Sequence, residues 1–143
     1  MIAFKKRILI VDDSPVMCGL LYMLFYQQYE VTVVTDGFEA LLHLQKAPPP
    51  ELIITDLSMP TLNGFDLIRT IRASAWLHHI PIIVISALEP HQHDLDLHRL
   101  GVECILQKPF KPAGLQEKVS STLAENAPPA PAYVLRSPVY KAG

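Results

Sequence analysis

The chain has 143 residues, of which 50% are hydrophobic and 18% are charged, and this composition is enough to form one domain with a buried core. Its net charge of −2 and its longest basic run, Lys5-Lys6-Arg7, indicate no direct binding to nucleic acid. No apolar stretch reaches the length of a membrane span and the first residues lack a signal-peptide pattern, so we expect a cytoplasmic protein without membrane contact.

Five short apolar runs alternate along the chain with five stretches of helical pattern. The expected strands are residues 7–11, 31–34, 52–55, 80–85 and 102–106. The expected helices are residues 15–28, a helix opened by Gly37 and ended by Pro48, a helix beginning near Asn63, residues 90–100 and residues 112–124. Right-handed crossovers fold such an alternation into a doubly wound parallel sheet with helices on both faces, and we expect the strand order 2-1-3-4-5 within this α/β fold.

Polar side chains follow four of the five expected strands. Asp12 and Asp13 follow the first strand, Asp56 the third, Ser86 the fourth and Lys108 the fifth. Each residue alone has an ordinary explanation, such as a helix cap, a turn or a solvated charge. Because the carboxyl ends of parallel strands share one edge, and the first and third strands are neighbours at the switch point, we expect these side chains to meet in one crevice.

Three carboxylates in one crevice predict a bound cation. Two carboxylates about 4 Å apart repel each other by about 4 kcal/mol at an effective dielectric constant of about 20. A hard divalent ion relieves this repulsion, and Mg²⁺ suits a few carboxylates, one carbonyl and retained waters, with Mn²⁺ as a substitute. We expect Asp13 and Asp56 to be direct ligands, Asp12 to act directly or through water, and the backbone carbonyl of Ser58 to complete the set.

The same cluster permits phosphoryl chemistry. With a cation on one side, a carboxylate oxygen of Asp56 can serve as a nucleophile toward phosphorus. Lys108 and the hydroxyl of Ser86 would then meet the phosphoryl oxygens from the other side. The sequence therefore predicts an aspartyl phosphate at Asp56.

Several short motifs carry a family resemblance over about residues 6–124. They resemble, position by position, the receiver domains of response regulators in two-component signalling, and the chain is similar to the single receivers that act in chemotaxis. The motifs are Val11-Asp12-Asp13-Ser14, Asp56 followed by Met59-Pro60 and Gly64, Ser86-Ala87, and Lys108-Pro109-Phe110.

The resemblance implies a flavodoxin-like (βα)5 fold, dependence on Mg²⁺ and a phosphoprotein that works in a phosphorelay. It implies transfer of a phosphoryl group to Asp56 from a histidine kinase or from the histidine of a phosphotransfer protein. On this reading the chain is no enzyme, although it assists its own phosphorylation and dephosphorylation. A downstream effector protein would read the resulting switch, in which Lys108 contacts the phosphoryl group and Ser86 moves toward it.

One position departs from the family pattern. Family members often carry an aromatic switch residue three positions before the lysine, and Ile105 stands there in this chain. We therefore expect the signal from Ser86 to travel by another route, such as backbone shifts between the fourth and fifth strands.

The first expected helix has no charged side chain from Pro15 to Tyr29. A helix that covers one face of a sheet needs only one apolar stripe, so the rest of its surface is expected to be exposed or in contact with another molecule. We expect a docking surface for a phosphodonor, or a homodimer contact, although additional burial under neighbouring segments or the tail would also explain the pattern. The expected patch consists of Met17, Leu21, Tyr22, Phe25 and Tyr26.

The chain is expected to divide into a receiver domain, residues 1–124, and a proline-rich C-terminal tail or linker, residues 125–143. Apolar tail residues between the prolines could bind the domain or a partner. Cys18 and Cys104 lie in apolar segments and are expected to be buried thiols. The six histidines lack the spacing of a metal site.

Two other function classes remain open from the sequence alone. One is an aspartyl-phosphate phosphatase, but that chemistry needs a second aspartate two positions after the nucleophile, and Ser58 stands there. The other is a scaffold that has kept the receiver fold but takes no phosphoryl group. The complete set of polar residues at the strand ends argues against it.

Overall fold

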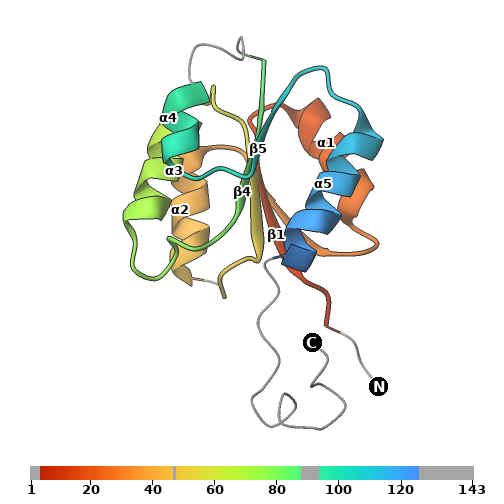
Figure 1. Ribbon diagram of the computed structural model, residues 1–143, viewed down its shortest axis with the longest axis horizontal. Coiled ribbons are helices and arrows are strands. Elements are labelled where there is room, and N and C mark those ends of the chain that lie inside the picture. Colours follow the sequence, from red (N-terminus) through yellow and green to blue (C-terminus); the bar gives the residue numbers. More distant parts are fainter. Residues whose placement is uncertain (1–3, 47, 88–93, 126–143) are drawn as a thin grey trace, which may run out of the picture.

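The computed structural model describes residues 4–46, 48–87 and 94–125 and contains one five-stranded parallel sheet (Figure 1). The strand order is β2-β1-β3-β4-β5, as predicted, so the fold is flavodoxin-like. The strands are β1 (Arg7–Val11), β2 (Glu30–Val34), β3 (Leu52–Thr55), β4 (Ile82–Ser86) and β5 (Cys104–Gln107).

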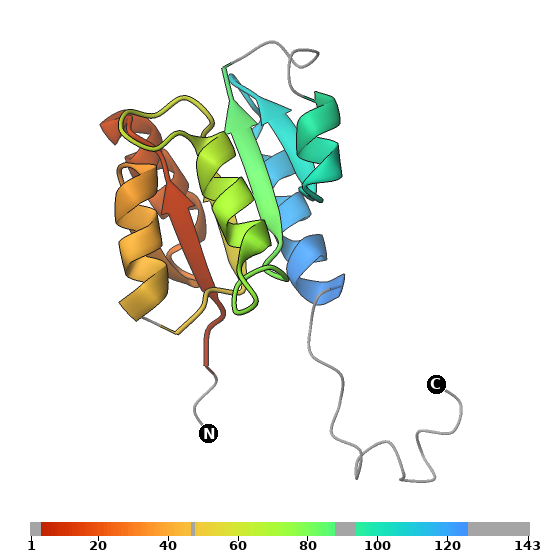
Figure 2. The ribbon, with the colours of Figure 1, turned by 90° about the vertical axis from the view of Figure 1, so that its left-hand side faces the viewer.

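Helices cover both faces of this sheet. Helices α1 and α5 lie on one face, and α2, α3 and α4 lie on the other, which Figure 2 shows from their side. Both faces of each central strand are therefore buried, which explains the continuous apolar runs in the sequence. The helices are α1 (Pro15–Phe25), α2 (Gly37–Lys46), α3 (Gly64–Ala73), α4 (Asp94–Arg99) and α5 (Pro112–Glu125).

Alternation along the strands divides the core into two layers. Leu9 and Ile53 point toward α2 and α3, whereas Ile10 and Ile54 point toward α1 and α5. All four side chains are essentially inaccessible to solvent. The two layers hold the strands in fixed register, so the residues that follow the strands also have fixed positions.

Several predicted boundaries are wrong by a few residues. Helix α1 ends at Phe25 rather than residue 28, because the chain must already turn toward β2, where the amide of Glu30 donates to the carbonyl of Lys6 at 2.9 Å. Strand β4 begins at Ile82 rather than residue 80, since Pro81 has no amide hydrogen to donate to a ladder.

Strand β5 begins at Cys104 rather than residue 102, because the preceding residues complete the turn after α4. Gly101 has a φ of 70°, and the amide of Val102 donates to the carbonyl of Leu97 at 3.3 Å. Helix α4 begins at Asp94, and the part of the predicted helix over residues 90–93 lies outside the described residues.

Cys18 and Cys104 are free thiols that are only half-buried, so the prediction of buried thiols is wrong. Cys104 packs at the margin of the core layer that faces α1 and α5, and Sγ of Cys18 donates to the backbone carbonyl of Asp12 at 3.0 Å. Within the described ranges, no helix has both the length and the apolar character needed to cross a membrane.

Candidate functional site

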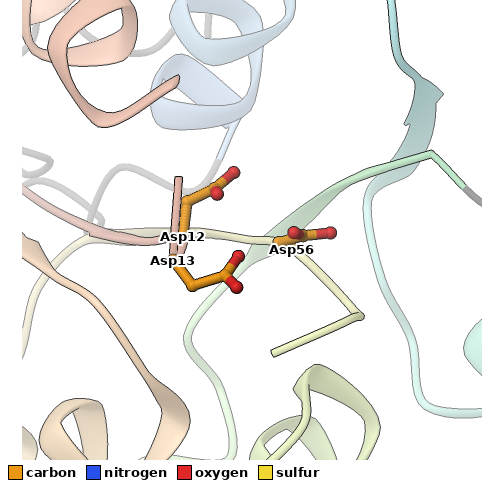
Figure 3. A group of neighbouring side chains, drawn as sticks. All are labelled: Asp12, Asp13 and Asp56. Carbon is orange, nitrogen blue, oxygen red and sulfur yellow. The ribbon is translucent and has the colours of Figure 1, made fainter. Parts of the chain in front are cut away.

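Three carboxylates lie together at the carboxyl edge of the sheet. Figure 3 shows Asp12 and Asp13 at the end of β1, beside Asp56 at the end of β3. One carboxylate oxygen from each residue lies within 4.8 Å of the other two. Asp12 is 1% exposed and Asp56 is 6% exposed, whereas Asp13 is open to solvent. The site therefore has two buried acids and one accessible acid.

The turn from β1 into α1 holds Asp12 in place. Its Oδ1 atom accepts a hydrogen bond from the amide of Ser14 at 2.9 Å. Ser14 is the N-cap of α1, and its hydroxyl oxygen accepts from the amide of Met17 at 3.3 Å. Pro15 then occupies the first turn, where its missing amide hydrogen does no harm. This arrangement leaves Oδ2 of Asp12 facing the site.

Asp56 is held by the backbone that follows it. Its Oδ1 atom accepts from the amides of Leu57 at 2.7 Å and Ser58 at 3.4 Å. Burial raises the pKa of Asp56 above its usual value, and the nearby carboxylate of Asp12 raises it further, whereas Lys108 and the two amides lower it. Its ionised form is therefore held in a poorly hydrated place, with Oδ2 turned toward the site.

Lys108 closes the site from β5. Its Nζ atom donates to Oδ2 of Asp12 at 3.0 Å and to Oδ2 of Asp56 at 3.4 Å. Burial lowers the pKa of Lys108, but its hydrogen bonds to the two carboxylates and their negative charges outweigh burial and raise that pKa overall. The ammonium group therefore stays charged and bridges two of the acids.

Ser86 lies at the same edge of the sheet, at the end of β4, and is 2% exposed. The amide of Lys108 donates to the backbone carbonyl of Ser86 at 2.8 Å, which ties the end of β5 to the end of β4. The five polar residues expected to converge at the switch point thus stand at the same edge.

Ile105 lies on β5, where it pairs with Val84 of β4, and its side chain is half-buried against the core on the α4 side. It borders a surface hollow together with Leu95 and His98 of α4. The position that often carries a mobile ring in the family therefore holds a branched aliphatic side chain that contacts the core.

A hollow beside Asp13 offers room for an ion and its waters. It has a volume of about 570 Å³, and both Asp13 and Ser58 border it. Mg²⁺ prefers oxygen ligands and keeps several of its waters. Carboxylate oxygens beside a backbone carbonyl, in a hollow that solvent can enter, fit this preference. The three aspartates are the one group of at least three His, Cys, Asp or Glu residues placed to hold a metal within the part of the chain that the structure describes.

Sequence reasoning missed the groups that hold Asp56 in place. The amides of Leu57 and Ser58 hold Asp56, and no side-chain pattern in the sequence announces them. The hydroxyl of Thr55 also donates to the carbonyl of Asp56, at 2.8 Å. The Met59-Pro60 turn was the available signal, since a tight turn after a strand can direct its amides back to the preceding carboxylate.

Gly64 is predicted to be indispensable to the position of Asp56. A Cβ atom at Gly64 would overlap the carbonyl oxygen of Asp56 and lie 2.7 Å from Cα of Leu57. We expect Gly64→Ala to lower the free energy of unfolding by about 1–3 kcal/mol, measured by urea denaturation. The matched control is Gly19→Ala in α1, where no atom lies within 4 Å of an added Cβ, so stability should stay equal or rise. Equal effects of the two substitutions would contradict the prediction.

The expected docking patch on α1 needs correction. Leu21 and Phe25 are each 1% exposed and belong to the core, and Met17 packs against the same layer. Tyr22 and Tyr26 remain accessible, at 44% and 38%. Because residues four apart share one side of a helix, Leu21 and Phe25 together face the sheet. Further exposed apolar side chains on α1 are Val16, Leu20 and Met23.

Comparison with known proteins agrees with this geometry. The family model described as "Response regulator receiver domain" matches residues 8–120. The chain is 32% identical over 124 residues to the chemotaxis protein CheY1 of Helicobacter pylori, covering 84% of this chain and 98% of that protein. It is 36% identical over 120 residues to the sensor histidine kinase TmoS of Ectopseudomonas mendocina. That match covers 84% of this chain but only 12% of the much longer kinase.

Solved structures show the same likeness. A response regulator receiver protein of Pseudomonas putida superposes with a TM-score of 0.77 at 35% identity, covering 84% of this chain and 99% of that one. The receiver domain of a sensor histidine kinase of Pseudomonas aeruginosa superposes with a TM-score of 0.74 at 31% identity, covering 85% and 99%. That domain was solved with a magnesium ion coordinated in its active-site cleft. With its fold, its acidic edge and the matched family model, the chain belongs to the response regulator receiver domains of two-component signalling.

Proposed function

We propose that the chain accepts a phosphoryl group on Asp56, in the cytoplasm, from the phosphohistidine of a histidine kinase or of a phosphotransfer protein. The observation that supports this most directly is the environment of its carboxylate. Oδ1 is held by two backbone amides, while Oδ2 lies 3.4 Å from the ammonium of Lys108 and faces the acidic cluster. Signalling rather than turnover is the expected outcome, because receiver domains act as switches.

The reaction forms one bond and breaks another. An oxygen lone pair of Asp56 attacks phosphorus, the bond from phosphorus to the imidazole nitrogen breaks, and the imidazole leaves and takes up a proton. Lys108 stands where it can neutralise charge on the transferred oxygens, and Ser86 lies at the same edge. The chain would also assist the later hydrolysis of its own aspartyl phosphate.

The acidic cluster is proposed to hold Mg²⁺, or Mn²⁺ in its place. Asp13 is the accessible carboxylate and would bind directly together with Asp56. Asp12 is paired with Lys108 and would act directly or through water, and the carbonyl of Ser58 would complete the protein's ligands. When bound, the ion would neutralise charge as the phosphoryl group approaches the carboxylates.

Output is proposed to follow a backbone route to an effector protein. Ser86 ends β4, and β4 pairs with β5 through Val84 and Ile105. A shift of Ser86 toward a phosphoryl group would pull on this ladder, since the amide of Lys108 also donates to the carbonyl of Ser86. The surface beside Ile105 and α4 is therefore expected to change without the swing of an aromatic ring.

The proposal is tested by incubating the purified chain with acetyl phosphate and following its intact mass. With Mg²⁺ present, we expect a gain of one phosphoryl group per chain, and we expect that gain to disappear when the metal is chelated. Sustained consumption of acetyl phosphate without a stable mass gain would favour a phosphatase. No reaction with either Mg²⁺ or Mn²⁺ would favour a phosphorylation-independent scaffold and overturn the proposal.

The exposed side of α1 is proposed to dock the histidine donor or a second copy of the chain. We expect the double substitution Tyr22→Lys and Tyr26→Lys to slow phosphoryl transfer from a phosphohistidine protein at least about tenfold. The reason is that the complex with the donor would lose two aromatic contacts that docking buries. Reaction with acetyl phosphate should not change. Phe38→Lys on α2 is the matched control, as Phe38 is exposed on the other face of the sheet.

If α1 instead forms a homodimer contact, the same double substitution should shift sedimentation toward the monomer. Unchanged donor transfer together with an unchanged oligomeric state would contradict both uses of this surface. The acidic site is not touched by these substitutions, so its phosphorylation serves as an internal control for folding.

A further inference from the structure

An aromatic hollow lies at the C-terminal end of α1, away from the acidic site. We call it the tyrosine hollow. Its volume is about 480 Å³, and it is lined by Phe4, Lys5, Tyr22, Tyr26, Tyr29, Glu30 and Val31.

Its aromatic side chains are preorganised and poorly covered. The rings of Tyr22 and Tyr26 stack with their centroids 5.4 Å apart and an angle of 9° between their planes. Phe4 is 93% exposed, so a large apolar surface faces solvent at the rim. Grooves lined by aromatic rings are typical binding sites for proline-rich segments, which lose little conformational entropy when they bind.

Helix α5 ends close to this hollow. Nζ of Lys6 donates to the carbonyl of Leu123 at 3.1 Å, and the two residues before Lys6 line the hollow. Nε2 of Gln116 also donates to the carbonyl of Leu24 at 3.3 Å, which joins α5 to α1. Figure 1 shows the start of β1 and the end of α5 at the same end of the molecule.

Residues 126–143 lie outside the described residues, but their composition suits the hollow. They contain four prolines, at 128, 129, 131 and 138, with apolar residues at 133–135 and 139–140. Arg136 and Lys141 are their only charged side chains, so this segment carries +2 while the rest of the chain carries −4. Seven residues separate Glu125 from Tyr133, enough to span up to about 25 Å.

Charge distinguishes the tyrosine hollow from a second one nearby. That second hollow is bordered by Pro49, Pro50 and Pro81, by Lys6, Arg7 and His79, and by Leu123 of α5, so nearness to the end of α5 does not separate the two hollows. Its one acid, Glu51, is already paired with Arg7 at 3.0 Å. Lys5 and Glu30 give the tyrosine hollow a formal charge of zero, against +1 for the second hollow, and the carboxylate of Glu30 has no ion-pair partner within the described part of the chain. A basic segment is therefore better matched to the tyrosine hollow.

We propose that the chain's own C-terminal segment, residues 128–141, binds in the tyrosine hollow, with its apolar residues against the rings of Tyr22, Tyr26 and Tyr29 and a basic side chain beside Glu30. Tethering gives the segment a local concentration on the order of millimolar, so even a weak contact is populated. Because Tyr22 and Tyr26 also belong to the exposed face of α1, the bound segment would compete with donor docking. This regulatory consequence rests on the function proposed above, whereas the contact itself does not.

The contact is tested on the ¹⁵N-labelled full chain by comparing amide spectra of the wild type and a tail variant. The variant carries Tyr133→Ser, Leu135→Ser and Tyr140→Ser, three changes that lie after α5 and leave the sheet intact. We expect the amide signals of Lys5, Tyr29 and Val31 to shift. Changes confined to residues after 125, or changes that fall on the amide signals of Glu51, His79 and Ile80 beside the second hollow, would overturn the proposal.

A pair of substitutions tests the hollow from its own side. Tyr26→Ser is expected to move the amide signals of residues 133–137 and 139–140, whereas Phe38→Ser, which removes an exposed ring on α2, is expected to leave them in place. Tenfold dilution should change neither set of signals. Loss of the shifts on dilution would mean that a second copy supplies the segment, which would refute binding within one chain. None of these spectra requires a phosphoryl group, so failure of this contact and failure of phosphorylation at Asp56 are distinguishable.

Discussion

Replacing Asp56 by asparagine is expected to abolish the gain of a phosphoryl group from acetyl phosphate. An amide oxygen is a poor nucleophile toward phosphorus, and the substitution keeps the shape of the side chain. The two neighbouring carboxylates are not expected to take over, because Asp12 is paired with Lys108 and Asp13 is the proposed ligand of the metal ion. Intact mass after incubation with Mg²⁺ measures the outcome, and a phosphoryl group on the Asp56→Asn chain would show that another residue is the acceptor.

The matched control is Asp66→Asn. Asp66 lies on α3, has a half-exposed side chain and pairs with Arg69 at 3.0 Å, a surface ion pair of small expected energy. This variant should gain the phosphoryl group as the wild type does. Loss of the reaction in both variants would indicate damage to the fold rather than removal of the acceptor.

The Asp56→Asn chain is also expected to unfold at an equal or higher temperature than the wild type without metal. The pKa of Asp56 is raised in the folded state, so its contribution to stability is fully present at low pH and is lost as pH rises through that folded-state pKa. At neutral pH the ionised carboxylate therefore opposes folding, and asparagine removes that charge. We therefore expect Asp56 to serve the proposed reaction rather than stability.

The sequence was sufficient for the fold and for the edge where the site stands. Apolar runs such as Ile53-Ile54, each followed by a polar residue, predicted strands whose ends share one edge. The strand order 2-1-3-4-5 then placed the ends of β1 and β3 side by side, and the three aspartates do lie together there. Their roles as acceptor and metal ligands remain predictions.

The side of α1 that faces the sheet could not be predicted from the sequence. Apolar side chains surround the whole helix, so no contrast marks the buried side, and Leu21 and Tyr22 were equally plausible as surface residues. Packing against the sheet decides between them: Leu21 is 1% exposed and Tyr22 is 44% exposed. A hydrophobic pattern can orient a helix only when a polar face opposes the apolar one.

The pairing of Lys108 was also out of reach. Its place after the fifth strand predicted proximity to Asp56, but its shorter contact is with Asp12, at 3.0 Å against 3.4 Å. The direction of the Lys108 side chain depends on how the end of β5 is held against the end of β4. The backbone hydrogen bond from the amide of Lys108 to the carbonyl of Ser86 holds these two ends together. A backbone hydrogen bond of this kind cannot be predicted from the types of the residues that form it.

Lys108→Gln is expected to slow phosphorylation by acetyl phosphate about 100-fold while leaving Mg²⁺ binding in place. The ammonium is 3.4 Å from the attacking carboxylate, on a side chain that is only 18% exposed, so its charge is weakly screened by water. A preorganised donor that meets charge developing in the transition state contributes roughly 10²–10³ in rate. The initial rate of mass gain measures the effect, with saturating Mg²⁺ in both samples.

Lys111→Gln separates this effect from a general loss of positive charge. Lys111 lies three residues further along, just before α5, and is exposed, so its removal changes the net charge equally but leaves the acidic site alone. We expect its rate to stay within about twofold of the wild type, because exposed charges at this range are screened. Equal rates for Lys108→Gln and the wild type would show that Lys108 pairs with Asp12 and Asp56 in the unphosphorylated chain but does not take part in phosphoryl transfer. A slow Lys108→Gln chain with an unchanged unfolding temperature would instead place this ammonium in the transfer step, since a purely structural bridge would alter stability before rate.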